Sequence, residues 1–142
     1  MLHNVVENLS ECTPTTLQAA YVEQLQATIE SVGAEQGAAE SGVDPERVDA
    51  LAVGDQPTLT VEEAASILAS DDDNPDAEAI AFEIRDHLLL GMTTAVLDVD
   101  TIAANIDADL TGQEVQQAIE GRIEMTLSQL AAIQAVIDGR EN

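Results

Sequence analysis

The chain contains no lysine and no tryptophan, and Cys12, Tyr21 and Phe82 are its only cysteine, tyrosine and phenylalanine. A single cysteine excludes an intramolecular disulfide and a cluster of cysteine metal ligands. Since aromatic residues are almost absent, a core can only be built from aliphatic side chains. Glycine and proline are also scarce, with eight and four among 142 residues, so few positions interrupt regular structure.

Apolar residues make up 45% of the chain, and alanine, leucine, isoleucine and valine account for most of them. They recur at steps of three and four residues, for example at Leu17, Tyr21 and Leu25. This spacing places them on one side of an α-helix. The sequence therefore predicts an all-α fold, and its length suits one compact domain or two very small ones.

Twenty-eight acidic residues against four arginines give a formal net charge of −24. High net charge is typical of disordered chains, but those chains are poor in apolar residues, and this one is not. A better interpretation is adaptation to a cytoplasm of molar salt, where the Debye length falls to about 3 Å and carboxylates keep the surface soluble. An acidic nucleic-acid mimic, or a protein that sequesters basic partners, is the third alternative.

The start of the chain lacks the basic and apolar segments of a signal peptide, and no apolar run reaches the length of a membrane span. We therefore expect a cytoplasmic protein with no membrane partner.

Residues 38–54 have the pattern of two short helices joined by a tight turn. Gly42 supplies the left-handed backbone that ends the first helix. Asp44 can cap the second helix, and Pro45 fits its first turn. The small and apolar positions that would pack the two helices together are Ala38, Val43, Val48 and Leu51.

A second segment, residues 102–137, resembles residues 38–69. In each, a short alanine-rich helix and a turn precede a second helix that ends at Gly54 or Gly121, and Thr58-Leu59 or Thr126-Leu127 then opens another helix. In the first half, Thr60 and Glu63 form a capping box, which predicts this helix at 61–69. This degenerate repeat predicts two helix-turn-helix-like helical subdomains packed around a long connecting helix near residues 76–92. The predicted divisions are an N-terminal arm at 1–13, a first half at 14–70, an acidic linker at 71–76 and a second half at 77–139.

Both halves resemble the helix-turn-helix of the phage-repressor and Cro-like class, the first at Ala38, Gly42, Val48 and Leu51 and the second through VQQAIEGR and MTLSQLAAI. In the second half, IDADLTG replaces the tight glycine turn. The chain as a whole resembles an uncharacterised haloarchaeal family through MLHNVV, DHLLLGMTTAVLDVDTIA and EVQQAIEGRIEMTL. That second resemblance implies a halophile and no particular activity.

The helix-turn-helix resemblance implies that the second helix of one half could enter the major groove of DNA. Glutamine can read adenine and arginine can contact phosphate. The DNA-binding candidates are Arg47, Gln113, Gln116, Gln117 and Arg122. Against this, four arginines spread over the chain make no basic patch, so the glutamines are also explained as a solvated helix face.

The segment DADLTG matches part of a calcium-binding loop, but Ala118 stands where the loop needs a bidentate glutamate. A turn in which Thr111 caps the next helix is the better interpretation. His87 lies in an apolar stretch and suits a buried or half-buried structural role. No nucleophile motif, phosphate loop or dinucleotide fingerprint is present, so we expect no enzyme, no cofactor, no metal and no small-molecule substrate.

Residues 88–97, LLLGMTTAVL, form the most continuous apolar segment. They could be core or a dimer seam, and the sequence favours core. Taken together, these features predict a non-enzymatic regulatory or adaptor module that acts through protein contacts, including self-association. The alternative is a transcriptional regulator that binds DNA directly.

Overall fold

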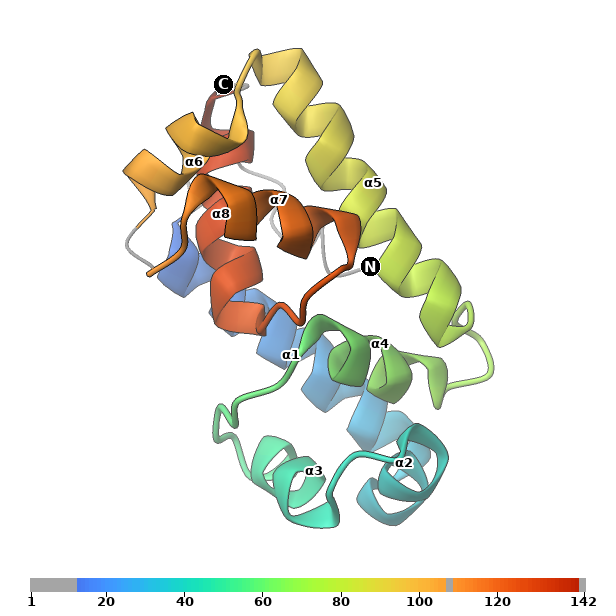
Figure 1. The fold of residues 1–142 in the computed structure, drawn as a ribbon. Coiled ribbons are helices and arrows are strands. Elements are labelled where there is room, and N and C mark those ends of the chain that lie inside the picture. Colours follow the sequence, from blue (N-terminus) through green and yellow to red (C-terminus); the bar gives the residue numbers. More distant parts are fainter. Residues whose placement is uncertain (1–12, 107–108, 141–142) are drawn as a thin grey trace.

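The computed structural model describes residues 13–106 and 109–140, and of Arg140 only the backbone. Within these ranges the chain forms α-helices and no strand, which confirms the all-α prediction (Figure 1). The arm predicted at residues 1–13 lies almost wholly outside the described part. The helices are α1 (Pro14–Val32), α2 (Ala34–Ser41), α3 (Pro45–Ala52), α4 (Val61–Ala69), α5 (Ala77–Ala95), α6 (Val99–Asn105), α7 (Gly112–Glu120) and α8 (Leu127–Arg140).

Side-chain caps explain where the helices begin. The Thr13 hydroxyl accepts a hydrogen bond from the Thr16 amide, so α1 starts at Pro14. Thr60 and Thr111 each form a reciprocal capping box with the glutamate three residues later. Such boxes satisfy two of the amides that a helix start leaves without a partner. The predicted starts of α4 and α7 are therefore confirmed.

The predicted geometry between α2 and α3 is also confirmed. Gly42 has a left-handed φ of 75° and ends α2. The Asp44 side chain accepts a hydrogen bond of 2.9 Å from the Glu46 amide and caps α3. Val48 and Leu51 are fully buried. The turn and the caps are local features, so the sequence specifies them directly.

The end of α5 differs from the prediction. The sequence predicts a connecting helix near residues 76–92, with Gly91 either ending the helix or lying within it. Instead α5 continues through the buried Gly91 to Ala95, and Val96 ends it with a left-handed φ of 55°. Packing at Gly91 outweighs the low helix propensity of glycine, which is only about 1 kcal/mol below that of alanine.

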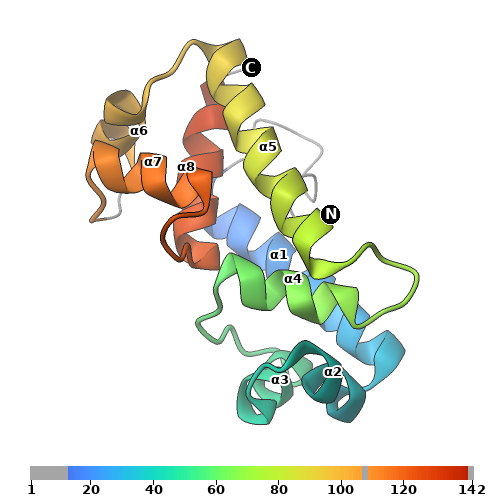
Figure 2. The same cartoon turned by 45° about the vertical axis from the view of Figure 1, so that its right-hand side comes forward.

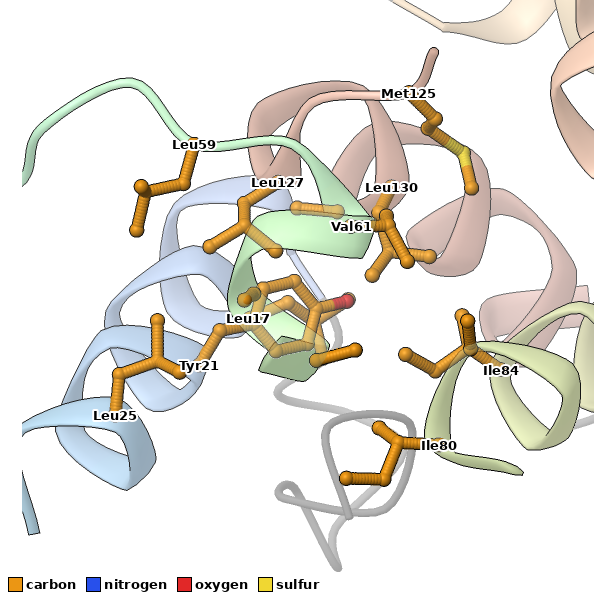
Figure 3. Packing of buried hydrophobic residues seen from close by; sticks show 14 of the residues in the cluster. Leu17, Tyr21, Leu25, Leu59, Val61, Ile80, Ile84, Met125, Leu127 and Leu130 are labelled. Carbon is orange, nitrogen blue, oxygen red and sulfur yellow. The ribbon is translucent and has the colours of Figure 1, made fainter. Parts of the chain in front are cut away.

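The helices share one continuous hydrophobic core. The long helix α1 packs on α8, while α5 packs on α4 and α8 (Figures 1 and 2). Figure 3 shows how leucine, isoleucine and valine side chains from these helices meet around Tyr21. Helices from the two predicted halves therefore interleave, and this packing does not confirm two separate subdomains. The predicted domain boundaries stay predictions.

The starts of α4 and α8 cross at an isolated antiparallel bridge between Thr60 and Thr126. The Val61 amide donates to the Met125 carbonyl at 2.8 Å, and the Leu127 amide donates to the Leu59 carbonyl at 2.9 Å. The repeat therefore aligns Leu59-Thr60-Val61 with Met125-Thr126-Leu127. The predicted match of Thr58-Leu59 with Thr126-Leu127 is therefore two residues out of register. It made the loop from Gly54 one residue shorter than the loop from Gly121 to Thr126, whereas the loop from Gly54 to Thr60 is one residue longer.

A chain of polar side chains crosses the aliphatic core. The hydroxyl of Tyr21 donates to Gln134 Oε1, and Gln134 Nε2 donates to Asp138 Oδ2 at 3.0 Å. Asp138 Oδ1 lies 3.0 Å from Nε2 of His87, which is half-buried. This confirms the half-buried position predicted for His87. The chain ties α1, α5 and α8 together by hydrogen bonds that demand specific geometry.

Candidate functional site

Arg47, the DNA-binding candidate of the first half, lies on α3 and is held by its own fold. Its guanidinium pairs with Glu63 on α4, with one hydrogen bond of 2.9 Å to Oε1, and donates to the Thr58 carbonyl at 3.1 Å. Glu63 also closes the capping box of α4. Arg47 therefore connects α3 to the start of α4.

The electrostatics of this pair follow from its hydrogen bonds. The bond from Arg47, aided by the Thr60 amide, lowers the pKa of Glu63 below its usual 4.5, although partial burial opposes the shift. The same pair raises the pKa of Arg47. Since Glu63 binds its proton less readily in the folded state, the pair stabilises the fold above pH 4.5, and the stabilisation is lost as the pH falls through the lowered pKa.

We therefore expect Glu63→Gln to lower the free energy of unfolding by about 1 kcal/mol at neutral pH, a value reduced because both side chains are about one third exposed. Below the lowered pKa the variant and the parent converge in stability. Urea unfolding in molar KCl as a function of pH measures this, with the exposed Glu30→Gln as the matched control. Equal destabilisation at acid and neutral pH would contradict the pairing.

The other four DNA-binding candidates gather on α7 and just after it. Gln113 and Gln116 are exposed and Gln117 is half-buried. Gln116 donates to Glu120 Oε1 at 3.0 Å, and Arg122 Nε lies 3.1 Å from Glu120 Oε2. The structure thus places Gln113, Gln116, Gln117 and Arg122 along α7 and just after it, and places Arg47 on α3.

Among the described side chains, each arginine pairs with a glutamate. The third pair is Arg85 on α5 with Glu62 on α4. The exposed side of α3 adds Glu46 and Asp49 and no cation. Phosphate contacts by lysine and arginine supply most non-specific DNA affinity, and these pairs leave no net positive patch for it. The surface geometry therefore does not favour a DNA interface.

Arg85 also packs closely on Gly121, at the end of α7. A methyl group built at Gly121 would lie 3.0 Å from Arg85 Nε and 3.3 Å from Cζ, and the glycine has a φ of 81°. Gly121 is thus required both for its left-handed backbone and for the close approach of Arg85. This contact fixes α7 against α5.

We expect Gly121→Ala to destabilise the protein by about 1–3 kcal/mol, because it strains the backbone and displaces Arg85. Gly139→Ala is the matched control, since no described residue has an atom within 4 Å of the added methyl group and the φ of Gly139 is ordinary. That control should be neutral or slightly stabilising. Thermal unfolding of both variants in molar KCl makes the comparison, and equal stabilities would contradict the role of Gly121.

The most exposed apolar surface lies on α5. Phe82 is 68% exposed, Val96 is 89% exposed, and Leu89 between them is also exposed. We call these three residues the α5 stripe. In Figure 1, α5 runs along one edge of the molecule. The apolar segment 88–97 is accordingly divided, since Leu88, Gly91 and Leu97 are buried whereas Leu89, Leu90 and Val96 are exposed.

Two shallow hollows flank the α5 stripe. One, of about 330 Å³, lies between α4 and α5. Its apolar lining comes from Ala77, Ala81 and Phe82, and its polar lining from Glu62, Ser66, Glu78 and Arg85. The other, of about 160 Å³, lies between α5, α6 and α7 and is lined by Leu89, Met92, Val99 and Ile119, with Gln116 and Glu120 at its rim. A row of projecting side chains beside apolar hollows is typical of a surface that binds another protein.

The described residues contain no group of three histidine, cysteine or acidic side chains arranged to hold a metal ion. Part of the DADLTG segment lies outside them, so this finding leaves the predicted absence of a metal untested. Over the same residues no single helix is long and apolar enough to cross a membrane, although α5 and α6, which meet at a bend of 96°, pass that test as a pair.

Residues 17–140 match the family of unknown function DUF5791, and the chain belongs to that family. No curated protein and no solved structure matches the chain.

Proposed function

We propose that this member of the DUF5791 family is a non-enzymatic regulatory or adaptor module that acts through protein contacts on the α5 stripe. The observation that carries the proposal is the exposure of Phe82 and Val96, at 68% and 89%, in a chain with only two aromatic residues. A soluble protein gains nothing for its own stability from such residues on its surface. Contiguous exposed apolar side chains mark interaction sites.

We also propose that the protein works in the cytoplasm of a halophile. A net charge of −24 without lysine suits molar salt, where repulsion between carboxylates is screened. The same salt strongly weakens binding that depends on phosphate contacts. Hydrophobic association does not depend on such contacts, so an apolar docking surface suits this environment better than a DNA-reading one.

Direct DNA binding is the alternative function. It would use the exposed glutamines of α7, as the helix-turn-helix resemblance of the second half implies. The arginine pairs disfavour DNA binding, because Arg47 and Arg122 each form an ion pair with a glutamate that neutralises their charge. No described feature of α3 or α7 favours DNA over solvent.

Site-specific photo-cross-linking tests the proposed function. A photoreactive phenylalanine analogue replaces Phe82 in the full chain, and the cells are irradiated at their native salt. Val53 is the matched control position, since it is 77% exposed but lies at the end of α3, away from the stripe. We expect protein adducts from position 82 and few from position 53. No protein adduct at position 82, or equal yields at both positions, would overturn the proposal.

A further inference from the structure

The α5 stripe has a regular spacing, because Leu89 lies seven residues from both Phe82 and Val96. Seven residues are nearly two helical turns, and the direction drifts by only about 20° per step. Phe82 and Leu89 therefore point to one side of α5, and Val96 caps the same helix seven residues further along the chain. Two copies placed antiparallel about Leu89 would bring Leu89 against its own copy and Phe82 against Val96.

The charges along α5 distinguish this arrangement from a parallel one. Its first half carries Glu78, Glu83 and Asp86, with Arg85 paired to Glu62. The second half, residues 87–97, contains no acidic residue, lysine or arginine. Parallel copies would place carboxylates against carboxylates. Antiparallel copies place the acidic half of each α5 helix against the uncharged half of the other α5 helix, which avoids like-charge contacts between these two helices.

The two hollows fit the same arrangement. The hollow of about 330 Å³ adjoins Phe82, and the hollow of about 160 Å³ adjoins Leu89 and Met92 towards the end of the helix. In an antiparallel pair the first hollow faces the other copy's Val96, and the second faces the other copy's Phe82. Each projecting side chain then meets an apolar recess, so the surface complements itself.

Val96 supplies an independent observation. It is a β-branched residue with a left-handed φ of 55° at the end of α5, where glycine or asparagine is the usual choice. It is also 89% exposed, so packing within the described fold does not compensate for the strained backbone. A side chain from a partner that packs against Val96 would explain why valine stands at this strained position.

We propose that the occupant of the α5 stripe is a second copy of this chain, paired antiparallel with the two Leu89 side chains at the centre. This proposal rests on the proposed function, because it names the partner of the same surface. The pair tightens as salt rises, since screening reduces repulsion between two strongly acidic chains while apolar contact persists. Opposed helix dipoles add a small favourable contribution.

Engineered cysteines test the geometry in the full chain, with Cys12→Ser as background and a short bis-maleimide cross-linker in molar KCl. Leu89→Cys should yield a covalent dimer. Phe82→Cys alone should not, because the two copies of position 82 would lie about 21 Å apart. A mixture of Phe82→Cys and Val96→Cys chains should yield the mixed dimer. Val53→Cys, exposed on another surface, is the matched control and should remain monomeric.

Val96→Asn separates association from folding. The asparagine relieves the strained backbone, so we expect a higher melting temperature for the chain together with a dimer at least tenfold weaker by sedimentation equilibrium. A purely structural role for Val96 would not move these two values in opposite directions.

The proposal is overturned if Leu89→Cys yields no dimer, or if Phe82→Cys or Val53→Cys alone yields as much dimer as Leu89→Cys. In that case, if a photoreactive residue 82 forms adducts with a different protein, the proposed function is retained and the partner on the α5 stripe is that other protein. If neither dimer nor adduct forms, the proposed function fails as well.

Discussion

In KCl of about 0.1 M or less we expect the protein to lose most of its folded structure, and in molar KCl we expect it to fold cooperatively. The formal charge of −24 on 142 residues makes the compact state repel itself. The Debye length is about 10 Å at 0.1 M and about 3 Å at 1 M, so only the higher salt screens neighbouring surface carboxylates. The free energy of unfolding rises more through this screening than through any single contact, because the reduced repulsion sums over the whole surface.

Circular dichroism and urea unfolding over a KCl series measure this effect. A variant in which the exposed residues Glu23, Glu30, Asp72 and Glu124 become glutamine or asparagine is the matched control. Its folding should require less salt than that of the parent, because the repulsion is smaller. Equal unfolding free energies in dilute and molar KCl would contradict adaptation to high salt.

Asp138→Ala should lower the free energy of unfolding by about 3 kcal/mol. Asp138 is only 5% exposed and accepts hydrogen bonds from Gln134 and from His87. The substitution removes the acceptor that links these side chains across α5 and α8. Removing one member of a buried polar chain lowers the free energy of unfolding by more than that member's net contribution, since its hydrogen-bond partners stay buried without it.

The exposed Asp86→Ala is the matched control, because it removes the same side chain and the same charge from the surface of α5. It should change stability by less than about 0.5 kcal/mol. Asp138→Asn keeps an acceptor oxygen and should fall between the two. Urea unfolding in molar KCl compares the three variants, and equal stability of the two alanine variants would contradict a structural role for the polar chain.

Features that depend on neighbouring residues could be predicted from the sequence. The left-handed Gly42, the Asp44 cap and the capping boxes at Thr60 and Thr111 all involve partners within three residues. Such signals decide where helices begin and end without reference to the rest of the fold. They identified α2, α3, α4 and α7 closely.

Features that depend on distant residues could not be predicted. The sequence left open whether Gly91 ends α5 or lies within it, and burial of that glycine in the core decides for the second. The contact of Arg85 with Gly121 joins residues far apart in the chain. Because α1 of the first half packs on α8 of the second half, the two halves share one hydrophobic core. A repeated sequence pattern alone suggests two separate halves.

The candidate site was only partly predictable. The sequence marked residues 88–97 as core or seam but did not divide them, because that division needs the rotation of a helix whose extent was uncertain. The spacing of Phe82, Leu89 and Val96 was the signal that could have revealed the stripe. The DNA-binding candidates came from resemblance, and the pairing of Arg47 and Arg122 with glutamates depends on the folded structure.

Selection from pooled random DNA duplexes, with the purified protein in molar KCl and its folded state verified by circular dichroism, tests most directly whether the chain acts through protein contacts or by reading DNA. We predict that no sequence motif is enriched, because the described arginines are neutralised and the exposed side of α3 is acidic. An enriched motif that disappears in the Gln113→Ala and Gln117→Ala variants, or in the Arg47→Ala variant, would contradict the account and establish a DNA-binding regulator.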